Sequence, residues 1–253
     1  MSRGARSAYR DFWAGVGERF PDLDGAESTR YYADNERRLF AEHFPPLEGL
    51  KILKTDLWDE AKNTRILAWA SRHGARAYGV DISEPTVVQA RAAFDREPLH
   101  AAIADIRDLP FRAASFQTVF VRDLLHHMAD PAPVLAEVMR VLAPGGRFLL
   151  IEPNASNPIV LLQTYLVPAE RLGRRSGPSH IERLLRGLPL TGVEMRAVEP
   201  LPLRRLVLHY RFGLPGLGRL RPALAALAGV ERLAQRLLPP ARWSYVRVTA
   251  SRT

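Results

Sequence analysis

Acidic and histidine side chains follow three hydrophobic runs of the sequence, and they define the chemistry that the chain can offer. Asp81, Asp105 and the pair His126–His127 each come at or shortly after the end of such a run. A carboxylate can accept hydrogen bonds from both hydroxyls of a ribose. An imidazole titrates near neutral pH and can take a proton from a hydroxyl nucleophile. The chain therefore carries groups suited to binding a nucleoside-like ligand and to general-base chemistry.

Alternating strands and helices must position these side chains. The expected strands are 50–55, 75–80, 99–103, 115–121 and 147–151, and the expected helices between them are 63–72, 83–94 and 133–142. This alternation predicts a parallel, doubly wound sheet with right-handed crossovers. Ligands of such sheets bind beyond the carboxyl ends of the strands, where the strand order switches direction. The acidic and histidine side chains are therefore expected to meet at one edge of the sheet.

The pattern divides the chain into three segments. Residues 1–46 are expected to form a helical cap, with one amphipathic helix around 9–20 and a second over 28–44. Residues 47–154 form the alternating core. Residues 155–253 begin with broken helices and continue with a strand at 192–199, an insertion at 203–240 and a final strand at 243–250.

Charge is distributed unevenly along the chain. The net charge is +9, and residues 155–253 hold sixteen arginines and five glutamates without lysine or aspartate, a balance of +11. Such a region can attract nucleic acid, anionic lipid or an acidic substrate, or it can simply be a solvated surface.

The chain has no cysteine, which excludes disulfides and thiolate metal sites and fits a reducing compartment. With no visible signal peptide or membrane-spanning run, a cytoplasmic location is expected.

Three segments resemble class I S-adenosylmethionine (SAM)-dependent methyltransferases. They are 78–83 (Tyr-Gly-Val-Asp-Ile-Ser), 104–111 (Ala-Asp-Ile-Arg-Asp-Leu-Pro-Phe) and 121–127, the last followed by a Pro-Gly-Gly turn at 144–146. The resemblance covers about 48–154 well and the final strand weakly. It implies an α/β Rossmann-like fold with a mostly parallel seven-stranded sheet, whose last two strands form an antiparallel hairpin.

The resemblance also implies SAM as the cofactor and assigns roles to residues. Asp81, with Ile82 beside it, would hold the ribose, Asp105 would accept from the adenine amino group, and Ile106 would pack on the ring. Arg122 would lie on the cofactor side of the loop that flanks the methyl group. His127 matches the histidine of a frequent Glu-His pair in that loop, and His126 replaces the glutamate. Both histidines are candidate catalytic bases.

The first motif departs from the family pattern. The family has an acid followed by a glycine-rich loop, but residues 53–64 contain no glycine, and Lys54 stands near the position of the acid. In one interpretation the rebuilt loop still binds SAM, with Thr55, Asp56, Asp59 and Glu60 at the methionine end and Arg30, Tyr31 or Tyr32 reaching its carboxylate. In the other, the loop no longer binds SAM, and the chain is a non-catalytic scaffold or accessory protein.

The insertion at 203–240 is expected to shape the acceptor pocket. Its leucines recur at helical spacing and arginines lie between them, a pattern typical either of a helix packed on the sheet or of one lying in a membrane interface.

Nucleic acid is not expected as a partner, because no RNA-binding module is recognisable and the leucine content is high. No metal is expected, since adjacent histidines point in different directions on most backbones. The hypothesis is methyl transfer from SAM to a small-molecule or lipid-like acceptor, at oxygen.

Overall fold

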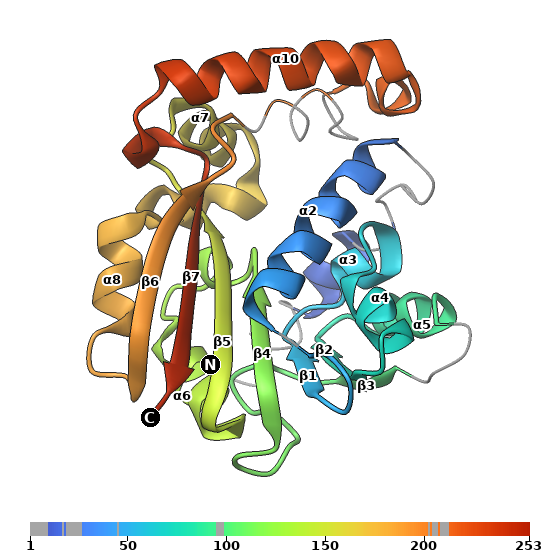
Figure 1. Cartoon of the computed structure of the whole chain (residues 1–253), viewed down its shortest axis with the longest axis vertical. Helices are drawn as coiled ribbons and strands as arrows, with labels where there is room; N and C mark the ends of the chain where they lie inside the picture. The colour runs from blue at the N-terminus through green and yellow to red at the C-terminus, as the bar shows by residue number, and fades with distance from the viewer. Residues whose placement is uncertain are drawn as a thin grey trace.

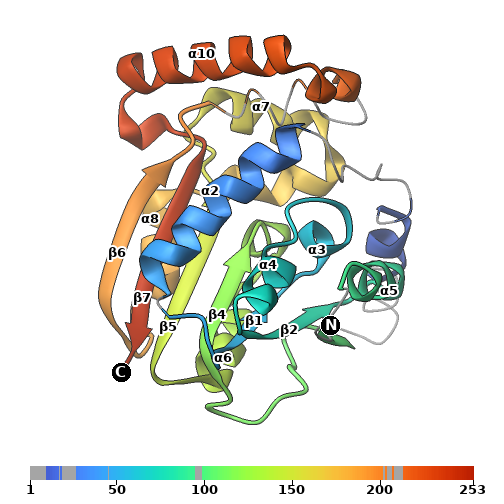
Figure 2. The ribbon, with the colours of Figure 1, turned by 45° about the vertical axis from the view of Figure 1, so that its right-hand side comes forward.

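The computed structural model describes residues 10–16, 18, 27–44, 46–94, 99–201, 203, 207 and 213–253. A seven-stranded sheet in the order β3-β2-β1-β4-β5-β7-β6 runs through it (Figures 1 and 2). The strands are β1 (Lys51–Lys54), β2 (Arg76–Asp81), β3 (His100–Ile103), β4 (Phe116–Arg122), β5 (Leu142–Pro153), β6 (Leu190–Val198) and β7 (Tyr245–Arg252). The predicted fold class is confirmed.

Strands β1 to β5 pair in parallel, whereas β7 is antiparallel to both β5 and β6. Strands β2 and β3 lie in turn on one side of β1, and the chain then crosses back so that β4 lies on the other side of β1. The switch point therefore lies between β1 and β4, where Leu53 pairs with Val119. Ligand-binding side chains are expected beyond the carboxyl ends of these two strands.

Helices cover both faces of the sheet. The α-helices and 3₁₀-helices (η) are α2 (Glu27–His43), α3 (Trp58–Lys62), α4 (Ile66–Arg72), α5 (Glu84–Ala92), η1 (Leu125–His127), α6 (Ala132–Val141), α7 (Pro158–Leu166), η2 (Pro168–Arg175), α8 (Pro178–Leu185), η3 (Pro215–Arg219), α10 (Arg221–Leu237) and η4 (Pro240–Arg242). One core joins the sheet to α6 and α8. A second core, on the opposite face, joins it to α2, α4 and α5.

Successive residues of each inner strand point to opposite cores. Leu53 belongs to the core of α6 and α8, while Ile52 belongs to the core of α2, α4 and α5. On β4, Phe120 likewise lies in the second core between two residues of the first. Strands buried on both faces read as continuous apolar runs, which is why the sequence predicts them well.

One predicted helix begins later than expected. The sequence pattern favours a single helix over 63–72, but α4 begins only at Ile66, after Arg65 in the left-handed region at a φ of 53°. The carboxylate of Glu60 accepts from the amides of Leu67 (3.0 and 3.2 Å) and Ala68 (3.4 Å), which have no partner inside the first turn of the helix. A buried acid from the preceding short helix therefore stabilises the start of α4.

Helix α2 and the C-terminal insertion meet at one end of the molecule. Helix α10 lies across the end toward which β4 points, and α2 contacts both α10 and η3 (Figure 1). Of the predicted first helix, residues 10–16 are helical, while Tyr9 and Phe20 are outside the described residues. In the part of the chain that the structure describes, no helix has the length and apolar character needed to span a membrane.

Candidate cofactor and acceptor site

The loop that follows β1 does without glycine because its backbone does not require it. No residue from Thr55 to Lys62 has a positive φ, the conformation for which glycine is usually needed. The Leu57 side chain is fully buried and reaches β2, where a Cβ on Gly79 would lie 2.3 Å from its Cδ2 atom. The glycine that makes room is therefore on the neighbouring strand.

A buried lysine organises this loop. The Lys54 side chain is 0% exposed, and its Nζ lies 3.0 Å from Asp56 Oδ1 and 3.7 Å from Asp59 Oδ2. Nζ also donates to the carbonyl of Asp56 at 3.2 Å and lies over the Phe120 ring. Burial lowers the pKa of Lys54, but the surrounding carboxylates outweigh it and hold the pKa above its usual range. Lys54 is therefore a permanent cation.

A second buried cation links the loop to α2. Arg122, at the end of β4, forms an ion pair with Glu36, and its Nε lies 3.3 Å from Asp123 Oδ2 and 3.9 Å from Asp59 Oδ2. Glu36 also accepts from the Thr64 hydroxyl. We call Glu36, Lys54, Asp56, Asp59 and Arg122 the charge network. Asp59 is its shared anion, because it lies near both buried cations.

Asp81 joins the loop to the end of β2. Its Oδ2 accepts from the amide of Leu57 at 2.9 Å and its Oδ1 from the amide of Ser83 at 2.8 Å. Burial raises its pKa, and these amides oppose the shift. An ionised carboxylate has about four acceptor positions. These amides leave acceptor positions of the half-buried Asp81 available for a ligand, and Ile82 beside it is also half-buried.

The residues after β3 form a tight turn beside Asp81. The amide of Ala104 donates to the carbonyl of Asp81 at 3.0 Å, so the two strand ends are adjacent. Asp105 is paired with Arg107, whose Nη2 lies 2.5 Å from Asp105 Oδ2. Ile106 is buried in the core of α6 and α8. Both predicted residues thus stand next to Asp81, but Asp105 is already held by a cation.

The structure places Thr55 differently from its predicted role. Its side chain is buried, its hydroxyl donates to the carbonyl of Phe120 at 3.4 Å, and its amide donates to the same oxygen at 3.2 Å. Thr55 therefore ties the loop to β4, and its hydroxyl faces the protein. Asp56 and Asp59 remain partly exposed. The side chain of Tyr31 lies outside the part of the chain that is described.

Two carboxylates hold the ring of His126, one of the two predicted bases. Its Nδ1 lies 2.8 Å from Glu152 Oε2 and its Nε2 lies 3.1 Å from Glu170 Oε2. Burial lowers the pKa of His126, but the two carboxylates prevail and raise it to about 10. An imidazole held as a cation at neutral pH does not accept a proton. The carboxylates at both ring nitrogens therefore disfavour His126 as the base.

Glu152 fixes the turn that carries both histidines. Its carboxylate accepts from the amides of Leu124 and Leu125 at 2.8 Å and of His126 at 3.1 Å, in addition to the His126 ring. Glu152, a single buried acid at the end of β5, thus accepts from three consecutive amides at the start of η1. Nothing in the local sequence around His126 indicates this partner, which lies 26 residues away.

His127 is the histidine with an available lone pair. Its Nδ1 faces the carbonyl of Ala169 at 3.2 Å and therefore carries the proton, while no described residue forms a hydrogen bond with its Nε2. Burial and the neighbouring His126 charge lower the pKa of His127 to about 4, so the ring is neutral. The edge of the ring also meets Trp13, with centroids 4.7 Å apart.

Comparison with known proteins agrees with the residue pattern. Residues 61–150 match a sequence family described as a methyltransferase domain, so the match begins directly after Glu60 and leaves residues 53–60 of the glycine-free segment outside. An O-methyltransferase of Penicillium expansum, cnsE, is 30% identical over 141 residues, which cover 54% of this chain and 50% of that protein. The ubiquinone/menaquinone biosynthesis C-methyltransferase UbiE of Desulfotalea psychrophila is 36% identical over 87 residues, which cover 34% of this chain and 35% of that protein.

Among solved structures, phosphoethanolamine N-methyltransferase 2 of Haemonchus contortus, in complex with SAM, superposes with a TM-score of 0.62 at 17% identity. The superposition covers 87% of this chain and 52% of that one. The chain spans at most about half the length of the curated relatives just described. The domain match and the strand order together show that this chain contains a methyltransferase domain, at residues 61–150, within a sheet of the Rossmann-like methyltransferase type.

Replacement of the buried cation is expected to destabilise the fold. Lys54→Met leaves Asp56 and Asp59 without their nearest cation, and breaking a buried ion pair in this way costs about 3–5 kcal/mol. Lys51→Met, on the same strand but only half-buried, is the matched control and is expected to have little effect. Chemical denaturation measures both, and equal stability of the two variants would contradict the role given to Lys54.

The buried carboxyl of Glu60 makes stability depend on pH. Burial raises its folded-state pKa to about 7 from 4.5, so its stabilising contribution is complete below pH 4.5 and is lost as the pH rises through 7. The unfolding free energy of wild type relative to Glu60→Gln should therefore fall between pH 5 and pH 8, by on the order of 1–3 kcal/mol. Denaturation at several pH values tests this, and a constant difference would disprove it.

Proposed function

We propose that the chain transfers a methyl group from SAM to the oxygen of a small-molecule or lipid-like acceptor. The observation that carries this proposal is the acid pair at adjacent strand ends, Asp81 after β2 and Asp105 after β3, beside the switch point of a methyltransferase-type sheet. The O-methyltransferase of Penicillium expansum among the relatives supports oxygen as the methylated atom. When bound, SAM supplies an activated methyl group on a sulfonium, so the protein's main task is positioning.

The described residues fit the adenosine end of this cofactor. In the proposal, the spare acceptor positions of Asp81 receive the ribose hydroxyls, and Ile82 lies alongside. Asp105 accepts from the adenine amino group while Arg107 holds it in place. Ile106 supports the ring from the core side.

The charge network fits the methionine end. An amino acid carries an ammonium and a carboxylate, so its site needs fixed charges of both signs. Asp59 and the ionised form of Asp56, whose pKa burial raises to about 7, are the partly exposed carboxylates that would receive the ammonium, and Lys54 forms ion pairs with both. Arg122 is the nearby cation that would attract the carboxylate, together with Tyr31 of α2. Thr55 contributes by tying the loop to β4.

Direct titration tests cofactor binding. Isothermal titration of the purified chain with SAM and with S-adenosylhomocysteine should show binding of both. Asp81→Asn, which keeps one acceptor oxygen, should weaken it by about tenfold, and Asp81→Ala more strongly. Asp108→Ala, an exposed acid of the next loop, is the matched control and should bind as wild type does.

A folded wild-type chain that binds neither compound would contradict the proposal. The chain would then be a scaffold on the methyltransferase fold. Equal affinity of Asp81→Ala and wild type would instead contradict the role given to Asp81.

We further propose that the enzyme works in the cytoplasm. We also propose that it contacts a membrane surface, because the apolar face of α10 continues from its inward side onto its exposed side. Leu224, Leu227 and Ala234 face inward, whereas Val230, Leu233 and Leu237 are 50%, 55% and 72% exposed. The exposed residues recur at spacings of three and four and so form one stripe. Arg232 and Arg236, both exposed, flank it. An apolar stripe with a basic border suits a bilayer containing anionic lipid.

Vesicle co-sedimentation tests this contact. The chain should sediment with vesicles that contain phosphatidylserine and less with neutral ones. Leu233→Ser combined with Leu237→Ser should lose most of the binding, because the stripe loses its apolar area. Leu188→Ser, a half-buried residue after α8, is a control for altered hydrophobicity elsewhere. Equal sedimentation of the stripe variant and wild type would refute the proposal.

A further inference from the structure

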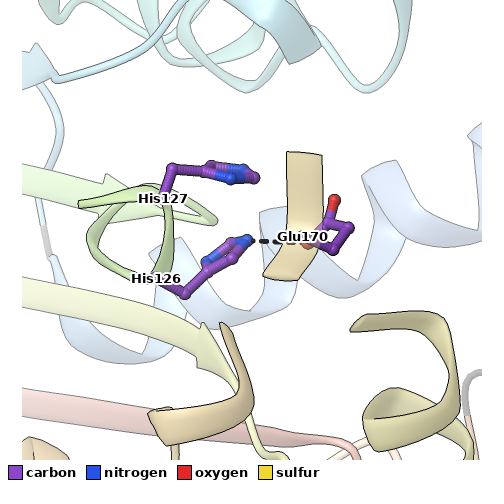
Figure 3. Close-up of side chains that lie close together, drawn as sticks. All are labelled: His126, His127 and Glu170. Atoms are coloured by element: carbon purple, nitrogen blue, oxygen red, sulfur yellow. Dashed lines mark hydrogen bonds and ion pairs between the residues drawn. The ribbon is translucent and has the colours of Figure 1, made fainter. Parts of the chain in front are cut away.

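Two histidines and a glutamate converge beside the end of β4. His126 and His127 belong to η1 and Glu170 belongs to η2, more than forty residues later. One potential ligand atom from each residue lies within 4.8 Å of the others. Figure 3 shows both imidazole rings extending from the same turn toward Glu170. The ring centroids are 3.9 Å apart, so these adjacent histidines share a direction, contrary to the sequence expectation.

Both rings are oriented by an acceptor on the far nitrogen. His126 Nδ1 lies 2.8 Å from Glu152 Oε2, and His127 Nδ1 lies 3.2 Å from the carbonyl of Ala169. Metal-binding histidines almost always donate their second N–H to a carboxylate or a backbone carbonyl, which fixes the ring and its tautomer. Here both rings carry that arrangement, and each directs its Nε2 away from the acceptor.

Spacing and access also suit a bound ion. Two ligands of a tetrahedral zinc ion, each at 2.0–2.1 Å, are separated by roughly 3.3 Å. His126 Nε2 and Glu170 Oε2 are already 3.1 Å apart. The Glu170 side chain is 24% exposed, so the cluster can be reached from outside.

We propose that His126, His127 and Glu170 bind one divalent transition-metal ion of the zinc type. Two imidazole nitrogens and one carboxylate oxygen favour zinc, cobalt or iron over magnesium and calcium, which prefer oxygen ligands throughout. The ion would replace the proton on His126 Nε2, as metal binding by imidazole requires.

The three protein ligands leave at least one position open, as catalytic zinc sites do. That position would accept an oxygen atom of the methyl acceptor, and this role alone rests on the proposed function. An acceptor with a hydroxyl next to the methylated position is the class that such an ion would select.

The test is metal binding by the full chain without an affinity tag, after treatment with a chelator. Titration with Zn²⁺ should give one equivalent bound, Co²⁺ should produce the visible absorption of a four- or five-coordinate site, and Mg²⁺ should do neither. Glu170→Gln and His127→Ala should each weaken Zn²⁺ binding by at least about tenfold. Their matched controls, Glu182→Gln and His73→Ala, replace exposed residues outside the cluster and should bind as wild type does. His126 is left unchanged because it also holds Glu152.

Binding of S-adenosylhomocysteine in the same samples separates this proposal from the methyltransferase proposal. Both cluster variants should keep the cofactor affinity of wild type, which also demonstrates that they are folded. If one variant is unfolded, the other decides the result. Failure of the folded wild type to bind Zn²⁺ or Co²⁺, or binding that Glu170→Gln leaves unchanged, would overturn the metal site.

Discussion

The ion pairs of buried Lys54 are the constraint on which the candidate site depends. A lysine without solvent contact is stable only if carboxylates compensate its charge, and here Asp56 and Asp59 do so at 3.0 and 3.7 Å. These pairs hold the loop after β1 in a conformation that requires no glycine. In the same loop the amide of Leu57 donates to Asp81, and this hydrogen bond links the loop after β1 to the end of β2.

The loop after β1 is held by ion pairs between charged side chains, where the family pattern has glycines. In the pattern that the sequence otherwise resembles, glycines allow the backbone to approach the cofactor closely. Here the loop carries charged side chains instead: Asp59 lies near both Lys54 and Arg122, and Arg122 forms an ion pair with Glu36 on α2. The N-terminal helix is thereby fixed to the sheet by a buried ion pair. Replacing any member of the charge network should change the electrostatic energy of the other members, because buried charges are weakly screened.

The fold could be predicted from the sequence because its strands are buried on both faces and its turns carry clear signals. Ser83 caps α5 at the start of the expected helix 83–94, and the strands after it follow their apolar runs. The partners of the buried charges could not be predicted. Glu36, Glu152 and Glu170 each contact residues at least 26 positions away, so no local pattern marks them. The expectation that adjacent histidines point in different directions was wrong, because a 3₁₀ turn aligns the rings of His126 and His127.

The most direct test of this account is a crystal structure of the chain with S-adenosylhomocysteine. We expect the ribose hydroxyls on the Asp81 carboxylate, the adenine beside Asp105, and the amino-acid end between Asp59 and Arg122, with the loop after β1 keeping the Lys54 ion pairs. Binding of the ligand elsewhere, or binding only after the Lys54–Asp56 pair has broken, would contradict the claim that a charged, glycine-free loop forms the cofactor site.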